Sequence, residues 1–471
     1  MRKTFVWALM AIMAVAGSAY AGRTGDIVAN ATFPTGAPTS TNNDDTCDIG
    51  VAPAATLLLP YFEVDLTNNQ NTNTLWTVTN VSNLPQIAHV TIWTDRSFPV
   101  LDFNIFLTGY DVQSISMFDI IANGVIAPPD GTTSDEDDNP PGQRSADNDA
   151  NPLLDITNCD NLAVNIPASL LADLRTALTT GRYSTCGSTL IGNNQADGRA
   201  RGYVTIDVAE SCSTDLPTDP NYYLTEILFD NVLVGDYQQV DRTNNFANGN
   251  PLVHIRAIPE GGDVGTTGTP GFETNFDRTF YSRYQPLGGV ADRRQPLPST
   301  FAARWITGGT GAFNTDFKIW REGVSGATLT CSAYTANASL AITELVRFDE
   351  EENPTTFTPD VIISPVPPGG VSLPETSRTP VSNTSIFPPN PGGDIAGWMY
   401  LNLDHGSPAG AIDPLIASQN WVIVSMGAEG RFAVDFDAAW LGNGCSPVAP
   451  VTAENGDDPV IGPADNVTPD F

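Results

Sequence analysis

A pattern of tryptophans occurs twice in this chain of 471 residues and constrains the fold more than any other feature. Residues 74–95 read TLWTVTNVSNLPQIAHVTIWTD, and residues 301–322 read FAARWITGGTGAFNTDFKIWRE. Each stretch has an apolar run that carries a Trp, a turn rich in small polar residues, and a second run that ends in Ile-Trp. Such runs between turn residues are typical of paired β-strands. We therefore expect a β-hairpin in each stretch. The tryptophans should correspond in pairs, Trp76 with Trp305 and Trp93 with Trp320.

A second pattern repeats in the same order along the chain. Gly202 begins the run GYVTID and Gly397 begins the run GWMYLN. In both runs an aromatic residue follows the glycine, and apolar residues then occupy every second position. Two matched landmarks in one order favour an internal duplication, although β-proteins reuse Trp, Gly and alternation so often that coincidence is the alternative. We expect residues of about 50–260 and 272–446 to form similar sandwiches.

Short strand-like runs continue through both halves with turn residues between them, which is the pattern of a β-sandwich. We predict a mostly β protein with two antiparallel β-sandwich domains, Ig-like or jelly-roll-like, and one short helix in the first half. Pro167 and Gly181 bound the helix, and four leucines form its apolar stripe. The expected segments are a signal peptide (1–21), a flexible N-terminal segment (22–46), a first sandwich (47–260) with an inserted loop and helix (128–195), a linker (261–271), a second sandwich (272–446) with a Pro-rich insertion (353–394), and an acidic tail (447–471).

The N-terminus predicts export. Arg2 and Lys3 precede a short apolar run from Phe5 to Ala16, and Ala19-Tyr20-Ala21 offers small residues for cleavage. The apolar run is shorter than the ~20 residues that span a bilayer. We expect a protein that is secreted or periplasmic after cleavage, with no membrane insertion.

The charge of the chain is strongly negative. The formal net charge is −33, and loss of Arg2 and Lys3 takes it to about −35, with Lys318 as the single remaining lysine. Such a surface repels the phosphates of nucleic acids, so we exclude nucleic acid as a partner. We expect an extracellular protein or a glycan as the partner instead.

Six cysteines in an exported chain are an even set, which favours three disulfides. The sequence contains no CxxC pair and only three histidines, so a zinc or iron–sulfur centre has little support. If the halves are independent, the two cysteines of the second half should pair with each other. This bond would be Cys331–Cys445. The other four cysteines allow three pairings, of which we favour Cys159–Cys186, which brackets the helix, with Cys47–Cys212. The alternative is a Cys47–Cys445 bond that ties the two ends together.

Four aromatic residues fall on the more polar face of their strands, because side chains alternate along a strand. These residues are Trp93, Tyr203, Trp320 and Trp398. Two interpretations are consistent with this position. The rings are covered by a loop or by the other domain, or they form a platform that binds a sugar or a peptide.

Carboxylates concentrate in the stretch 130–149, where Asp135, Asp137 and Asp138 are candidate ligands for calcium. The stretch lacks the spacing of an EF-hand, and Pro140-Pro141 follows at once, so a solvated loop is the competing interpretation. A second acidic run, 349–353, has the same two interpretations. We expect no other cofactor.

Motifs for catalysis are weak. The strongest local string is Asp404-His405-Gly406-Ser407, but a catalytic triad is normally assembled from distant positions. The sequence contains no GxSxG, HExxH or phosphate-binding loop. We therefore expect a non-catalytic binding or structural protein of the cell exterior. The alternative is a secreted hydrolase that acts on polysaccharide through a carboxylate pair in a cleft between the sandwiches.

Overall fold

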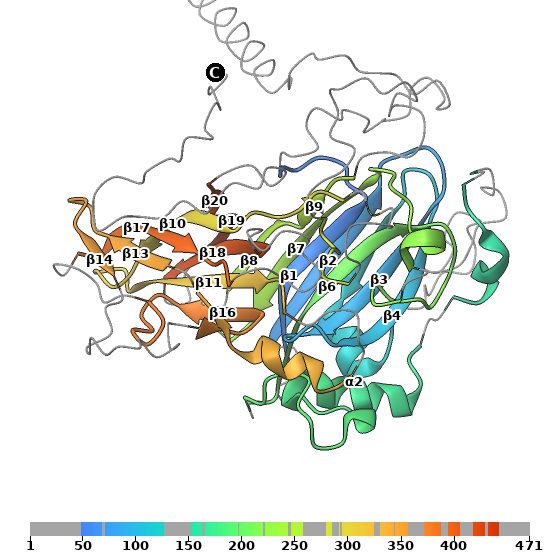
Figure 1. The fold of residues 1–471 in the computed structure, drawn as a ribbon, viewed down its shortest axis with the longest axis horizontal. Coiled ribbons are helices and arrows are strands. Elements are labelled where there is room, and N and C mark those ends of the chain that lie inside the picture. Colours follow the sequence, from blue (N-terminus) through green and yellow to red (C-terminus); the bar gives the residue numbers. More distant parts are fainter. Residues whose placement is uncertain are drawn as a thin grey trace, which may run out of the picture.

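The structure, a computed structural model, describes residues 49–441 with gaps at 68–70, 127–150, 152, 163–164, 196, 220–221, 244–245, 258–278, 285–291, 293, 325–329, 343, 357–371, 388–393, 406–417 and 429–431. The described chain forms several antiparallel sheets and only a few helices, which confirms the predicted mostly β class (Figure 1). No helix among the described residues is long and apolar enough to cross a membrane.

The strands fall into two groups along the sequence. The first half contains β1 (Thr56–Asp65), β2 (Thr72–Asn80), β3 (Gln86–Thr94), β4 (Pro99–Leu107), β5 (Val112–Ser116), β6 (Arg199–Ala209), β7 (Leu233–Asp241), β8 (Phe246–Pro251) and β9 (Val253–Ile255). The second half contains β10 (Thr300–Ile306), β11 (Phe313–Arg321), β12 (Leu340–Ala341), β13 (Glu344–Phe348), β14 (Pro354–Thr356), β15 (Ser372–Leu373), β16 (Thr376–Pro380), β17 (Ala396–Asn402), β18 (Asn420–Ala428), β19 (Phe432–Asp437) and β20 (Ala439–Trp440). The helical segments are η2 (Asp119–Asn123), η3 (Ile156–Asn161), α2 (Ala168–Thr180), η4 (Ser184–Cys186), η5 (Tyr222–Glu226) and η6 (Ala333–Ala338).

Two sheets form the first half, one with the order β4-β3-β6-β1-β9 and one with the order β5-β2-β7-β8. Aliphatic residues on alternate positions fill the space between them. Val90, Ile206 and Leu57 are cross-strand neighbours, and Leu57 reaches the backbone position of Gly235 in the opposite sheet. Burying one face of each sheet in this way is what holds a sandwich together.

The second half repeats the strand order of the first. Its two larger sheets have the orders β14-β13-β17-β10-β20 and β16-β11-β18-β19, beside a short pair β12-β15. When β10 is matched to β1 and β17 to β6, every strand of the first half finds a partner at the same place in the second. A duplicated sandwich predicts this order, and duplication itself stays a prediction.

The tryptophan repeat does not mark corresponding strands, so that part of the prediction is wrong. Trp76 lies on β2 and Trp305 on β10, whereas the strand that corresponds to β10 is β1. Trp93 on β3 and Trp320 on β11 are mismatched in the same way. The expected pairing within each stretch does not form, because β2 and β3 belong to different sheets, as do β10 and β11. A single bridge, Gly308–Phe313, closes the turn between β10 and β11.

The glycine-led runs, in contrast, do lie on corresponding strands. Gly202 on β6 and Gly397 on β17 each face the neighbouring strand so closely that a Cβ would lie 2.0 Å from a carbonyl oxygen, that of Trp93 or of Phe348. Only glycine permits this approach of two backbones. The shared requirement explains why both runs begin with glycine.

The predicted helix is present as α2. It follows Pro167, as the sequence pattern indicates, and ends at Gly181, which adopts the left-handed conformation at φ 67° and satisfies the last carbonyls. Its own residues Leu174 and Leu178 are buried.

The disulfides differ from the predicted pairs. Cys159 bonds to Cys212, and Cys186 bonds to Cys331, so the predicted Cys159–Cys186, Cys331–Cys445 and Cys47–Cys212 bonds are wrong. The Cys331–Cys445 prediction assumed independent halves, and the Cys159–Cys186 prediction assumed a bond that brackets the helix. The Cys186–Cys331 bond instead ties the segment after α2 to the second half.

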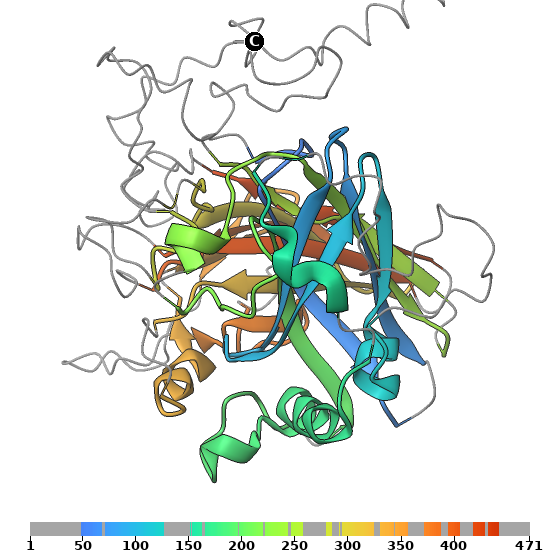
Figure 2. The ribbon, with the colours of Figure 1, turned by 90° about the vertical axis from the view of Figure 1, so that its right-hand side faces the viewer.

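The two halves pack closely together although their strands run in different directions (Figures 1 and 2). Strand β8 lies beside β19, and β1 contacts β11 and β16. One cluster of buried apolar residues runs through both halves. The described parts of the two halves therefore form a single body.

Several predicted features lie outside the described residues. They are the signal peptide, the N-terminal segment with Cys47, the acidic loop with Asp135, Asp137 and Asp138, the linker 261–271, much of the Pro-rich insertion, Cys445 and the acidic tail.

Candidate functional site

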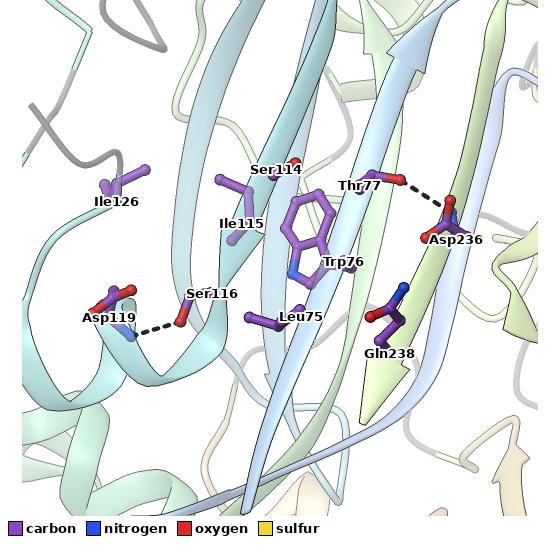
Figure 3. A pocket seen from close by; sticks show the side chains of 10 residues that line it. All are labelled: Leu75, Trp76, Thr77, Ser114, Ile115, Ser116, Asp119, Ile126, Asp236 and Gln238. Atoms are coloured by element: carbon purple, nitrogen blue, oxygen red, sulfur yellow. Dashed lines mark hydrogen bonds between the residues drawn. The ribbon is translucent and has the colours of Figure 1, made fainter. Parts of the chain in front are cut away.

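A groove of about 310 Å³ crosses the outer face of the sheet β5-β2-β7-β8 (Figure 3). Alternation along β2 turns Trp76 into the sandwich and leaves Leu75 and Thr77 facing outward. Cross-strand pairing then builds the floor in two rows. The rows are Ser116–Leu75–Gln238 and Ser114–Thr77–Asp236.

One wall of the groove is the chain that leaves β5. The turn η2 begins at Asp119, whose backbone N–H donates a hydrogen bond to the Ser116 hydroxyl (3.3 Å). The Asp119 carboxylate accepts one from the Asn123 amide (2.8 Å), and Ile126 closes the same side. These bonds fix the wall against the sheet.

The floor of the groove combines one outward aliphatic side chain, Leu75, with polar side chains on either side of it. The described residues offer no hydrogen-bond partner to the Asp236 carboxylate or the Gln238 amide. No arginine, lysine or histidine is among its described lining residues. Hydroxyl, amide and carboxylate groups around the Leu75 and Ile126 side chains suit a ligand that is rich in hydroxyls, and the two carboxylates repel anions.

Three of the four aromatic residues predicted to bind a ligand are buried between the halves. Trp93, Tyr203 and Trp320 are each at most 2% exposed. Trp93 stacks on Tyr203 with ring centroids 5.7 Å apart, and the edge of Trp320 meets Tyr203 at 6.0 Å. The platform interpretation is wrong for these three, and the alternative that the other domain covers them holds.

The fourth aromatic residue, Trp398, remains half-buried. Its ring stacks on Phe348 with centroids 4.3 Å apart and planes 5° from parallel. The two residues are cross-strand neighbours on β17 and β13. Trp398 therefore stays a candidate binding residue.

A buried carboxylate, Asp435 on β19, joins the halves. It accepts hydrogen bonds from the Lys318 ammonium (2.6 Å), the Tyr237 hydroxyl (2.8 Å), the Asn248 amide (2.8 Å) and the Ser425 hydroxyl. Tyr237 and Asn248 come from the first half. Burial lowers the pKa of Lys318, and the contact with Asp435 opposes that shift. Lys318, the single lysine after the predicted cleavage site, thus forms a structural ion pair with Asp435.

Asp207 on β6 is a second buried carboxylate at the junction. It accepts hydrogen bonds from the hydroxyls of Tyr222 (2.6 Å) and Tyr281 (2.7 Å), and the Arg294 guanidinium lies 3.4 Å away. Tyr281 and Arg294 belong to the segment between the two sets of strands. Donors from several elements fix this carboxylate as well.

Glu375 is the third buried carboxylate of the junction. It accepts hydrogen bonds from the Ser97 hydroxyl, the Arg283 guanidinium and the Gly323 N–H (3.1 Å). Ser97 lies in the first half, and Glu375 lies in the second. Buried, fixed carboxylates of this kind set the relative position of elements and are closed to a substrate.

The acidic run 349–353 forms a turn after β13. The carboxylates of Asp349, Glu351 and Asp394 offer oxygens within 4.8 Å of one another. The shared hydrogen bond with Asp394 and its charge raise the pKa of Glu351. Exposed acidic groups often gather without an ion, so this cluster alone assigns no metal.

The string at 404–407 does not form a catalytic pair in its described part. The Asp404 carboxylate accepts hydrogen bonds from the N–H (2.8 Å) and hydroxyl of Ser418, and His405 Nε2 lies against the Glu322 carbonyl oxygen. Ser407 lies outside the described residues. Asp404 and His405 thus support the chain locally.

The sequence pattern did not predict the groove, although it indicated the outward residues of two of its strands. The outward positions of β2 and β5 alternate with buried ones, so Thr77 and Ser114 belong to a solvated face. Asp236 and Gln238 join this face through the pairing of β2 with β7, more than 150 residues away. No local pattern reveals that pairing.

Comparison of the chain with protein-family models, curated proteins and solved structures finds no match. The site must therefore be interpreted from its own chemistry.

Proposed function

We propose that the protein is an exported, non-catalytic binding module that holds a neutral extracellular glycan on the outer face of the sheet β5-β2-β7-β8. The groove carries this proposal, because the Asp236 carboxylate and the Gln238 amide, which have no hydrogen-bond partner among the described residues, lie beside the aliphatic side chain of Leu75. Sugar hydroxyls can donate to Asp236 and exchange hydrogen bonds with Gln238, while a C–H face lies on Leu75. The two disulfides among the described residues support an oxidising compartment outside the cytoplasm.

The buried carboxylates support a binding role over a catalytic one. Asp435 and Glu375 accept hydrogen bonds across the two halves, and Asp207 binds the segment between them. The junction that a hydrolase would use as a cleft is therefore filled by buried, hydrogen-bonded carboxylates. One observation favours the hydrolase alternative. The groove contains two carboxylates, Asp119 and Asp236, and glycosidases use a carboxylate pair.

A glycan array of neutral cello-, xylo- and chito-oligosaccharides tests the proposal, followed by titration of the best ligand. Asp236→Ala should weaken binding about tenfold, because a hydrogen bond to a charged group contributes about 1.5–3 kcal/mol. Asp173→Asn on α2 is the matched control and should bind like the wild type.

Mass spectrometry of the bound oligosaccharide distinguishes the two functions. An intact ligand after long incubation supports the binding module. Shortened products that disappear in Asp119→Asn and Asp236→Asn would establish the hydrolase. Absence of any bound glycan on the array would contradict the proposal.

A further inference from the structure

Each half carries one stacked aromatic pair at a corresponding place. In the first half, Trp93 on β3 stacks on Tyr203 on β6 with planes 6° from parallel. In the second half, Phe348 on β13 stacks on Trp398 on β17 with planes 5° from parallel. Strands β3 and β6 occupy the same places in their sheet as β13 and β17 in theirs.

The turn that follows each stack is also shared. Thr94 and Asp349 start these turns, and each side chain accepts backbone N–H bonds from residues two and four positions later. The fourth residue of each turn has positive φ, 60° at Ser97 and 68° at Glu352. The two stacks therefore present the same backbone frame, and only the side chains differ.

The first stack is covered by a basic–aromatic pair from the segment that joins the halves. Tyr284 stacks on Trp93 with ring centroids 6.0 Å apart and planes 15° from parallel. Arg283, the preceding residue, donates to the Ser97 hydroxyl of the adjacent turn (3.2 Å) and to Glu375. One ring on the stack and one cation at the turn thus make up this contact.

The second stack is half-buried, and its turn is far more acidic. Phe348 and Trp398 remain partly exposed, while Val346 and Tyr400 on the same face are buried. The turn reads Asp349-Glu350-Glu351-Glu352, and Asp394 adds a further carboxylate. Arg304 lies opposite Trp398 on β10, on the side of β17 away from this turn, and its guanidinium lies over Phe436.

We propose that the Phe348–Trp398 stack and the acidic turn 349–352 form a docking surface for an extended segment of another polypeptide that carries an aromatic residue next to a basic one. The aromatic ring stacks on the Phe348–Trp398 pair, in which Phe348 corresponds to Trp93, as Tyr284 does on Trp93. The basic side chain pairs with the carboxylates of the turn. The negative turn draws in a cationic segment and repels an acidic one. The surface lies on a different sheet from the groove and does not depend on it.

A peptide with the sequence of residues 279–284, TFYSRY, is a direct probe of this surface. The full chain should bind it saturably in the millimolar range or below, and added salt should weaken binding. Peptides with Tyr284→Ala or with Arg283→Glu should each bind about tenfold more weakly.

Protein variants locate the contact. Glu351→Gln with Glu352→Gln leaves the stack intact and should remove most of the salt dependence. Trp398→Ala should weaken binding about tenfold, with its melting temperature measured to exclude unfolding. Tyr110→Ala, an exposed aromatic residue on the first half, is the control and should bind normally.

Absence of saturable binding to the wild type would overturn the proposal. Equal binding by the wild type and both site variants would do the same. Neutral oligosaccharides that compete at Trp398 without any effect of the acidic turn would identify a glycan platform in place of the peptide surface.

Discussion

Replacing Asp435 with alanine should lower the free energy of unfolding by about 3–5 kcal/mol. The change leaves the Lys318 ammonium in the interior without its counter-ion, at 1% side-chain exposure, and removes the acceptor for Tyr237 and Asn248. Uncompensated buried charge is among the most destabilising defects a protein can have. Urea unfolding followed by far-UV circular dichroism measures the loss.

A double variant separates the charge from the packing. Lys318→Met combined with Asp435→Leu removes both charges and keeps apolar volume, so it should recover most of the loss and fall within about 1–2 kcal/mol of the wild type. Asp173→Asn on α2 is the surface control and should change stability by less than about 0.5 kcal/mol. If Asp435→Ala unfolds at the wild-type urea concentration, the buried hydrogen bonds and ion pair of Asp435 do not stabilise the protein.

Removing the Cys186–Cys331 disulfide should have the second large effect. The bond closes a loop of 145 residues, and chain entropy predicts a stabilisation of about 4–5 kcal/mol. Cys186→Ser with Cys331→Ser should therefore lower the melting temperature markedly. Differential scanning fluorimetry under oxidising conditions provides the measurement.

The Cys159–Cys212 bond is the matched control because it closes a loop of 53 residues within the first half. Its removal should cost about as much stability by the same entropy estimate, yet it should leave the junction between the halves intact. Limited proteolysis should therefore separate the halves faster only in the Cys186/Cys331 variant. Equal cleavage patterns in both variants would contradict a bridging role.

Some features of the fold follow from local sequence. Pro167 and Gly181 mark the helix because helix ends have local chemical requirements, and both ends were predicted. The runs that begin at Gly202 and Gly397 share their leading glycine because the close approach of the neighbouring backbone admits only glycine. The β class was predictable because the alternation of apolar and polar residues is also a local pattern.

Other features depend on pairing between distant segments. The tryptophan repeat was placed one strand out of register because it assumed that consecutive strands pair, whereas β2 and β3 lie in different sheets. Trp93 and Trp320 are buried because the halves cover each other, which no single strand reveals. The Cys331–Cys445 prediction failed for the same reason, because Cys331 bonds to Cys186 of the first half. Contacts between segments far apart in sequence are set by the tertiary structure. Such contacts form both the groove and the surroundings of the buried carboxylates.

Scanning calorimetry of the intact chain tests most directly whether the two sandwiches form one body. The buried carboxylates, the shared apolar cluster and the Cys186–Cys331 bond predict a single transition in which the calorimetric and van't Hoff enthalpies agree. Two separate transitions, or a second half that melts alone at the same temperature as in the full chain, would contradict the account.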